Sequence, residues 1–335
     1  MILLLVIMIA SAQTAPTILL SKYSWTAEGN VVGKVHVSGE GTSPKNLSVK
    51  GKDANRFTID KYNTLLIRQQ NSREGRMWYD ITIEARTATG KISGAFRIVS
   101  DAFFSNKVIA HQGAWRNSGA VGNSIASLKQ AIVMGAGGTE FDVNMSADSV
   151  LFVHHDRNIG DINIEETAAA SLSKMKIKNG EYLPTLESYL REGMKQNTTK
   201  LVLEIKPSGV SKARAAAAAE KVVELVRKHK AQGWVDYISF DYGACLKVLE
   251  MDPFARVAYL NGDMAPADLA KHGFFGIDYN HKVLSEKVEW IKEAHDHNLT
   301  VNVWTIDDPQ QWEFFLKHGV DFITTDEPEK LLERL

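Results

Sequence analysis

Apolar runs and amphipathic segments alternate along the second part of the chain, residues 106–335. Continuous apolar runs bounded by turn residues are typical of buried strands, and apolar residues repeated every three or four positions are typical of helices. Repeated strand–helix units over this length predict an α/β protein with a (β/α)8 TIM-type barrel. The alternative is an open doubly wound sheet, but no glycine-rich dinucleotide-binding loop follows the first strand to support it.

Nine strands are predicted in this region, although a barrel of this type has only eight. They are Val108–Ala114, Gly138–Met145, Val150–His155, Lys200–Pro207, Val235–Asp241, Arg256–Asn261, Phe275–Asn280, Thr300–Ile306 and Phe322–Thr325. Helices are predicted at Ser124–Met134, Leu186–Gln196, Ser211–His229, Ser285–His297 and Pro309–His318. The second and third strands are separated only by residues 146–149, and a crossover helix needs about a dozen residues. We therefore expect these two runs to form a hairpin that rises above the barrel and returns to its rim.

The first part of the chain has a different spacing of apolar and polar residues. From Lys22 to Ser100, short runs with a period of two are separated by clusters that contain glycine. This pattern predicts a small all-β sandwich domain over residues 22–100. The runs Arg56–Asp60, Leu65–Ile67 and Tyr79–Ala85 loosely resemble a cadherin-like repeat. The acidic calcium-binding motifs of cadherins are not evident, so this resemblance implies a fold and no chemistry.

The N-terminus carries a pattern of its own. Ile2–Ile9 is apolar and uncharged, and the small residues Ala10, Ser11 and Ala12 follow it. The run fits the core of a signal peptide over residues 1–12 and is too short to span a bilayer. No lysine or arginine precedes it, and a buried first strand is the alternative. We expect the protein to be exported, either to a periplasm or to the medium.

The charge and composition of the chain bear on which partners it can bind. The formal net charge is −1, so no electrostatic argument favours nucleic acid or an anionic membrane. Hydrophobic residues make up 44% of the chain, which is enough for a large core. Cys245 is the only cysteine, and this excludes internal disulfides and thiolate zinc clusters. These observations give no support to a nucleic-acid partner or an anionic membrane and leave the oligomeric state open.

Acidic residues gather near the ends of two predicted strands. Glu140 and Asp142 are two positions apart, so they face the same side of their strand. Glu204 lies on another strand, with Lys206 two positions further on. Carboxylates that converge in a barrel repel one another unless a cation lies between them. Oxygen ligands favour Mg²⁺ or Ca²⁺ over zinc, and a salt bridge to a neighbouring lysine is the alternative.

Two histidines are candidates for acid–base catalysis. His111 and His155 follow predicted strands, and an imidazole can both accept and release a proton near neutral pH. A lone histidine at a strand end is more often structural than catalytic. The catalytic interpretation therefore depends on the whole set of acidic and basic residues.

The same residues carry a family resemblance. The stretch Ile109–Ala114 resembles the His-Arg-Gly motif that opens the glycerophosphodiester phosphodiesterases, and Asn123–Leu128 resembles their Pro-Glu-Asn-Thr/Ser helix start. Thr139–Val143 is similar to their Glu-Leu-Asp-Val strand, Val153–Asp156 to their His-Asp motif, and Leu203–Pro207 to their Leu-Glu-Ile-Lys motif. Val301–Thr305 and Gly319–Pro328 resemble their closing strands. The resemblance covers Lys107–Leu335 with order and spacing kept.

The resemblance implies an activity and a role for each matching residue. It implies metal-dependent hydrolysis of glycerophosphodiesters to an alcohol and glycerol 3-phosphate. Glu140, Asp142 and Glu204 would be metal ligands, and His111 and His155 the acid–base pair. Lys206 would lie near the phosphate, and Trp304 would form a wall beside the glycerol or the alcohol.

Two positions depart from the family pattern. The arginine after the first histidine is Gln112 here, and the glutamate before the helix-starting asparagine is Gly122. We expect Gln112 to reach the barrel mouth and bind substrate through neutral hydrogen bonds only. Restoring arginine at position 112 is then expected to raise turnover about tenfold, unless Arg116 or Lys206 already supplies the charge. The departures also admit a weakly active or inactive homologue that binds an anionic ligand or a surface.

Overall fold

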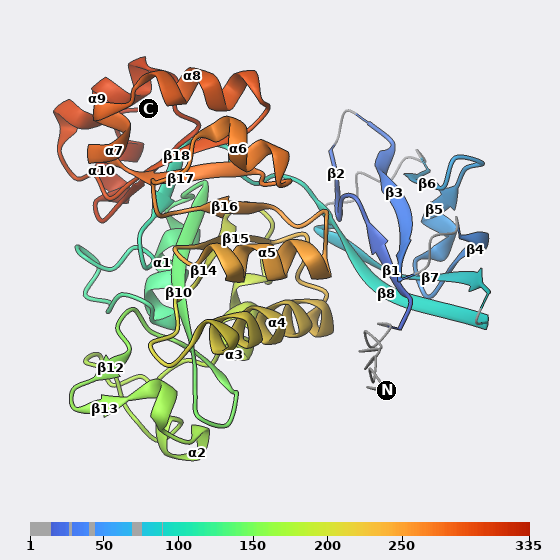
Figure 1. Ribbon diagram of the computed structural model, residues 1–335, viewed down its shortest axis with the longest axis horizontal. Helices are drawn as coiled ribbons and strands as arrows, with labels where there is room; N and C mark the ends of the chain where they lie inside the picture. Colours follow the sequence, from blue (N-terminus) through green and yellow to red (C-terminus); the bar gives the residue numbers. More distant parts are fainter. Residues whose placement is uncertain (1–14, 27–28, 40–43, 69–75, 89) are drawn as a thin grey trace, which may run out of the picture. The chain divides into compact units, whose positions relative to one another are not determined.

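The computed structural model describes residues 15–26, 29–39, 44–68, 76–88 and 90–335. The chain divides into two compact units, Met1–Ile98 and Val99–Leu335 (Figure 1). The predicted signal peptide, residues 1–12, lies wholly before the first described residue, so the export of the protein stays a prediction. Within the described ranges, none of the helices is both long enough and apolar enough to cross a membrane.

The N-terminal unit is a β-sandwich. One sheet has the order β1 (Thr17–Leu20), β3 (Val31–Ser38), β6 (Thr64–Ile67) and β5 (Phe57–Ile59). The other has the order β2 (Ser24–Trp25), β8 (Gly90–Ser100), β7 (Trp78–Thr87) and β4 (Lys45–Lys50). A short 3-10 turn, Ala54–Arg56, precedes β5. The predicted all-β region is confirmed, and its first strand begins five residues before Lys22.

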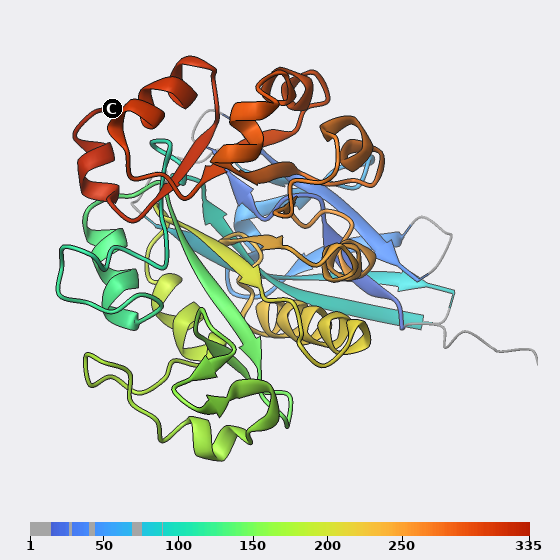
Figure 2. The ribbon, with the colours of Figure 1, turned by 60° about the vertical axis from the view of Figure 1, so that its left-hand side comes forward.

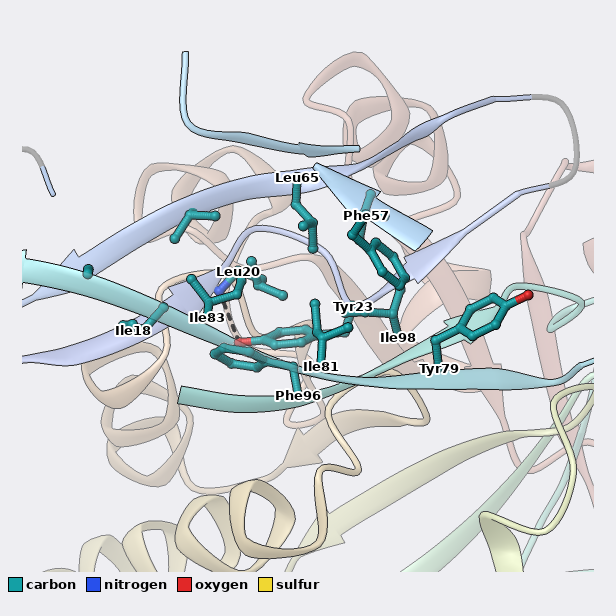
Figure 3. Packing of buried hydrophobic residues seen from close by; sticks show 13 residues of the cluster. Ile18, Leu20, Tyr23, Phe57, Leu65, Tyr79, Ile81, Ile83, Phe96 and Ile98 are labelled. Carbon is teal, nitrogen blue, oxygen red and sulfur yellow. Dashed lines mark hydrogen bonds between the residues drawn. The ribbon is translucent and has the colours of Figure 1, made fainter. Parts of the chain in front are cut away.

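A shared core holds the two sheets of this unit together. Alternate residues of β7 are buried, as its period-two pattern predicts. Figure 3 shows Leu65 and Phe57 of the first sheet in one cluster with Ile81 and Tyr79 of the second. No comparison bears on the cadherin-like resemblance, and it stays a prediction.

The C-terminal unit is a closed barrel of eight parallel strands. They are β9 (Val108–Ala110), β10 (Gly138–Met145), β14 (Lys200–Ile205), β15 (Val235–Ser239), β16 (Val257–Tyr259), β17 (Gly276–Asn280), β18 (Thr300–Trp304) and β19 (Phe322–Thr325). The ring closes because β9 pairs in parallel with both β10 and β19. This closure confirms the predicted barrel and excludes the open doubly wound sheet.

The predicted hairpin is also confirmed. The strand β11 (Leu151–Val153) runs antiparallel to β10, with Val143 opposite Val153 and Met145 opposite Leu151. The chain therefore returns to the rim, where the backbone N–H of His154 donates to the carbonyl of Asp142 at 3.0 Å. The hairpin thus delivers His154 and His155 to the end of the strand that carries the acidic pair.

Helices surround the ring of strands (Figure 2). They are α1 (Ile125–Val133), α3 (Leu186–Gly193), α4 (Lys212–His229), α5 (Tyr242–Met251), α6 (Pro266–Lys271), α7 (His281–Glu286), α8 (Glu289–Asp296), α9 (Pro309–Lys317) and α10 (Pro328–Leu332). Ser124, Ser211 and Asp308 cap α1, α4 and α9 through side-chain hydrogen bonds. A small insertion with β12 (Asn158–Ile159), β13 (Ile162–Asn163), a 3-10 turn (Ile164–Glu166) and α2 (Ala169–Leu172) lies between β11 and α3.

The single helix predicted at Ser285–His297 is wrong. The side chain of Asn280 accepts a hydrogen bond from the backbone N–H of Lys282, so α7 begins directly after β17. Lys287 has φ −127° and ψ 54°, which lies outside the helical region and ends α7. The helix α8 then starts afresh at Glu289. The pattern of apolar residues crosses this break and could not reveal it.

Candidate active site

A cavity of about 180 Å³ lies at the carboxyl ends of the barrel strands, where catalytic groups of such barrels are found. One side is ionic and the other mainly apolar. The lining residues are His111, Glu140, His155, Glu204, Lys206, Ile238, Phe240, Leu260, Asp278, Trp304, Thr305 and Thr324. Of the substrate-contact candidates, Lys206 and Trp304 line the cavity and Gln112 does not.

The three predicted metal ligands lie together. Asp142 of β10 stands in register with Glu204 of the adjacent β14, and Glu140 precedes Asp142 on the same face. Each carboxylate offers one oxygen, and these oxygens all lie within 4.8 Å of one another. Exposed fractions of 4%, 1% and 7% for Glu140, Asp142 and Glu204 show that water supplies little of their solvation.

One lysine serves two of these carboxylates. The Nζ atom of Lys206 lies 3.0 Å from Oδ1 of Asp142 and 2.8 Å from Oε1 of Glu204. Burial acts to raise the pKa of Asp142, but Lys206 overcomes this effect and holds that pKa below its usual range. Burial and the charge of Asp142 raise the pKa of Glu204 to about 8. Three buried carboxyls share one lysine, so they cannot all be ionised without an excess of negative charge.

The donor set fits a divalent cation. Burial, with Asp142 and Glu204 close by, raises the pKa of Glu140 well above its usual range. Its Oε1 atom is buried and accepts no hydrogen bond from the residues that the structure describes. An unpaired carboxylate oxygen in a buried site is costly unless something binds it. A hard cation held by these three residues would satisfy that oxygen and offset the mutual repulsion.

Two short loops position the acidic residues. Asn123 forms a double contact with Asp142: its Nδ2 donates to Oδ2 at 2.8 Å, and its Oδ1 accepts from the Asp142 backbone at 2.9 Å. The backbone N–H of Gln112 donates to Oε2 of Glu140 at 3.0 Å. Sequence reasoning saw Asn123 only as part of a helix start. Its position before the Ser124 cap was the available signal.

Each candidate histidine is oriented by a carboxylate. Nδ1 of His111 lies 2.7 Å from Oδ1 of Asp326, and its Nε2 lies 3.9 Å from Oε2 of Glu140. Nδ1 of His155 lies 2.8 Å from Oδ1 of Asp156. Because Nδ1 is engaged in both rings, Nε2 is the nitrogen that each can present to a substrate.

Asp326 is a functional candidate that sequence reasoning missed. Burial acts to raise its pKa, but His111 and Arg116 lower it below the usual range. Arg116 contacts Asp326 and also lies 2.7 Å from Asp307 and 3.3 Å from Glu327. This arginine is therefore committed to a network of carboxylates. The acidic residue directly after the last strand was the available signal.

Gln112 and Gly122, the two residues that depart from the family pattern, are neighbours in the structure. Gln112 has φ 55°, a left-handed conformation that directs its side chain over Gly122. A Cβ atom at position 122 would collide with Oε1 of Gln112. The amide side chain therefore occupies the space that a residue larger than glycine would need.

This geometry revises the expectation for Gln112→Arg. We now expect kcat/KM for glycerophosphodiesters to change less than about threefold, because the side chain does not line the cavity and Lys206 already does. Kinetics of wild type and variant across several headgroups would check this. A tenfold rise would mean that an arginine at position 112 turns into the cavity and contacts the phosphate.

The opposite wall of the cavity is aromatic and aliphatic. Trp304, at the end of β18, packs edge-to-face on Phe240 with ring centroids 5.5 Å apart. Ile238 and Leu260 are buried beside them. The indole N–H of Trp304 donates to the backbone carbonyl of Asp278 at 2.8 Å, which fixes the ring. Carbon atoms of a substrate can pack here while its charged part faces the carboxylates and Lys206.

A closed parallel barrel with clustered carboxylates, a lysine and two oriented histidines at its strand ends defines the active site of a barrel enzyme. The sequence model of the glycerophosphoryl diester phosphodiesterase family matches residues 111–330. The chain belongs to this family. It is accordingly a phosphodiesterase of the hydrolase class.

Known relatives are similar over about the same share of the chain. A solved glycerophosphodiester phosphodiesterase from Parabacteroides distasonis is 42% identical, with a TM-score of 0.67, over 68% of this chain and 95% of its own. A glycerophosphodiester phosphodiesterase from Caldanaerobacter subterraneus subsp. tengcongensis is 27% identical over 67% of this chain and 96% of its own length. An Oleispira antarctica phosphodiesterase, solved with its product sn-glycerol-3-phosphate, shares the fold at 24% identity, with a TM-score of 0.60, over 69% of this chain and 96% of its own.

Proposed function

We propose that this protein hydrolyses glycerophosphodiesters to an alcohol and sn-glycerol 3-phosphate with the aid of Mg²⁺ or Ca²⁺. Family membership supports the reaction class. The observation that carries the proposal is the buried triplet Glu140, Asp142 and Glu204 beside two oriented histidines. A divalent cation held by this triplet would offset the negative charge of the phosphodiester as the nucleophile approaches.

The chain's own residues then bind and orient the substrate. Lys206 presents its ammonium group at the junction of Asp142 and Glu204, where it can also reach a phosphate oxygen. Trp304 and Phe240 exclude water from the opposite side. The charged and apolar halves of the cavity thus hold a phosphodiester in one orientation.

The two histidines move the protons. One imidazole takes the proton of the attacking hydroxyl, and the other donates a proton to the leaving alkoxide. His111, held by Asp326, and His155, held by Asp156, both line the cavity, and either ring could take either role. The nucleophile is either the neighbouring glycerol 2-hydroxyl, which would give a cyclic phosphate that water opens, or a water molecule directly. A substrate without the 2-hydroxyl separates these routes, since only direct attack by water would still cleave it.

A metal-dependent turnover assay tests the proposed function. Activity on a panel of glycerophosphodiesters should vanish with a chelator and return with Mg²⁺ or Ca²⁺, because the three clustered carboxylates need a divalent cation to offset their mutual repulsion. Release of glycerol 3-phosphate would be measured directly. Full activity in a metal-stripped sample would contradict metal dependence. Anion binding without turnover would favour the alternative of an inactive binding homologue.

A further inference from the structure

A buried carboxyl group in the cavity has no role in the mechanism above. Asp278, in the middle of β17, is 2% exposed and lines the cavity. Within the described chain, its side chain has a single hydrogen-bond donor, Nδ2 of Asn302 at 2.9 Å. The same amide also donates to Thr324 at 2.8 Å. A carboxyl group can accept several hydrogen bonds, so this one has capacity left for a ligand.

Asp278 lies in apolar surroundings, where a carboxyl group with so few hydrogen-bond donors is unusual. Ile238 and Leu260 are buried in the same part of the barrel, and burial raises the pKa of Asp278 to about 7. Desolvating a carboxyl group is unfavourable unless donors replace the lost water. A purely structural partner for Asn302 could be a smaller, neutral group. An acid at this position is better explained by a donor that arrives with the substrate.

Asp278 stands across the barrel from the acidic triplet. In the closed ring, β17 is four strands from β10 in either direction. Glu140, Lys206 and Asp278 line the same cavity, so a ligand whose phosphate lies near the triplet can extend its other end toward β17. The apolar wall between the two sides, which includes Phe240 and Trp304, suits a short carbon chain.

We propose that Asp278 accepts a hydrogen bond from the terminal hydroxyl of the substrate's glycerol moiety and so makes the enzyme specific for an unsubstituted glycerol end. This inference rests on the proposed function and adds a specificity determinant to it. In a glycerol 3-phosphate unit the 2-hydroxyl lies beside the phosphate, and the terminal hydroxyl is the polar group farthest from it. An acyl chain on that terminal oxygen would remove the donor and need space beside the buried Asp278.

A pair of substrates isolates this contact. One is sn-glycero-3-phosphocholine, and the other is the same diester built on 1,2-propanediol, which keeps the 2-hydroxyl and lacks the terminal one. Wild type should favour the first in kcat/KM by about 10- to 100-fold, the range for a hydrogen bond to a charged group. Asp278→Ala should reduce that preference to below about threefold, and Asp278→Asn, which keeps one acceptor oxygen, should retain part of it.

Asp268→Ala is the matched control. It removes the same carboxyl group from the surface of α6, where Asp268 pairs with Lys271, and should leave the preference within about twofold. If Asp278→Ala keeps the wild-type preference, or if it lowers both substrates equally, the proposal is overturned. The same conclusion follows if wild type shows no preference. Asp278→Asn provides the comparison if the alanine variant does not fold.

A binding measurement separates this inference from the proposed function. Calorimetry would compare glycerol 3-phosphate with 1,2-propanediol 1-phosphate, which keeps the 2-hydroxyl and lacks the terminal one, on the full chain in the presence of Mg²⁺. The terminal hydroxyl should improve Kd about tenfold or more in wild type but not in Asp278→Ala. Failure of turnover on both diesters would contradict the proposed function. Equal affinities for the two monophosphates in wild type would contradict the role of Asp278 whether or not turnover is seen.

Discussion

His111→Ala is expected to lower kcat for a glycerophosphodiester by about 10²- to 10⁴-fold, the usual contribution of one acid–base group. Its Nδ1 is held by Asp326, and its Nε2 lies close to the acidic triplet, so the ring is positioned to exchange a proton at the reacting centre. KM should change much less, since the phosphate contacts come from other residues. Steady-state kinetics at saturating metal would measure the two parameters separately.

Two comparisons make the His111 result specific. His154→Ala is the matched control, because His154 adjoins His155 but does not line the cavity and bonds the carbonyl of Asp156. It should keep activity within about threefold. Added imidazole should restore part of the turnover of His111→Ala, because a small base can enter the space left by the ring. Normal kcat in His111→Ala would exclude this residue from proton transfer.

Much of the site follows from the period of the strands. Glu140 and Asp142 had to share a face, and a parallel barrel brings their strand ends beside Glu204. The hairpin also followed from length alone, because residues 146–149 cannot hold a crossover helix. These inferences needed only local geometry, and the structure confirms the fold on which they rest.

Other parts of the site depend on contacts that no local pattern carries. Asp326 meets His111 across 215 positions in the sequence. Asp278 sits inside a short apolar strand, where one acidic residue gives no sign of whether it faces a cavity or a salt bridge. Gln112 was expected at the barrel mouth, but a left-handed backbone turns it toward Gly122. Such a φ value in a residue other than glycine is not readable from the sequence.

Some helices and one strand also could not be predicted from the local pattern of residues. The cap at Asp241 starts α5, which sequence reasoning did not predict. The helix α6 has only six residues and starts with Pro266, so its period is too short to detect. In the N-terminal unit, Thr17–Leu20 joins a sheet although it lies outside the predicted domain. Strand pairing with Val35–Ser38, which lies far along the chain, decides that outcome.

Glu204→Gln is expected to weaken Mg²⁺ or Ca²⁺ binding by about 100-fold or more, since changes merely around metal ligands typically cost 10- to 100-fold. A neutral amide oxygen cannot replace the charge of the lost carboxylate, while Glu140 and Asp142 remain. Without metal the variant should be at least as stable as wild type, because it relieves repulsion among buried carboxylates and Lys206 keeps Asp142 at 3.0 Å. With metal the order should reverse, since wild type gains more stability from binding.

Calorimetry for metal affinity and thermal unfolding with and without metal would test this reversal. Glu224→Gln is the matched control: its carboxylate pairs with Lys221 on the surface of α4, and its loss should change neither measurement by much. A structural role for Glu204 alone would lower Tm in both conditions and leave metal affinity intact. The predicted pattern, a metal-free Tm that is equal or higher together with a lost metal response, arises only if Glu204 binds the cation. Unchanged metal affinity in Glu204→Gln would remove this residue from the ligand set and, with it, the geometric basis for a three-carboxylate site.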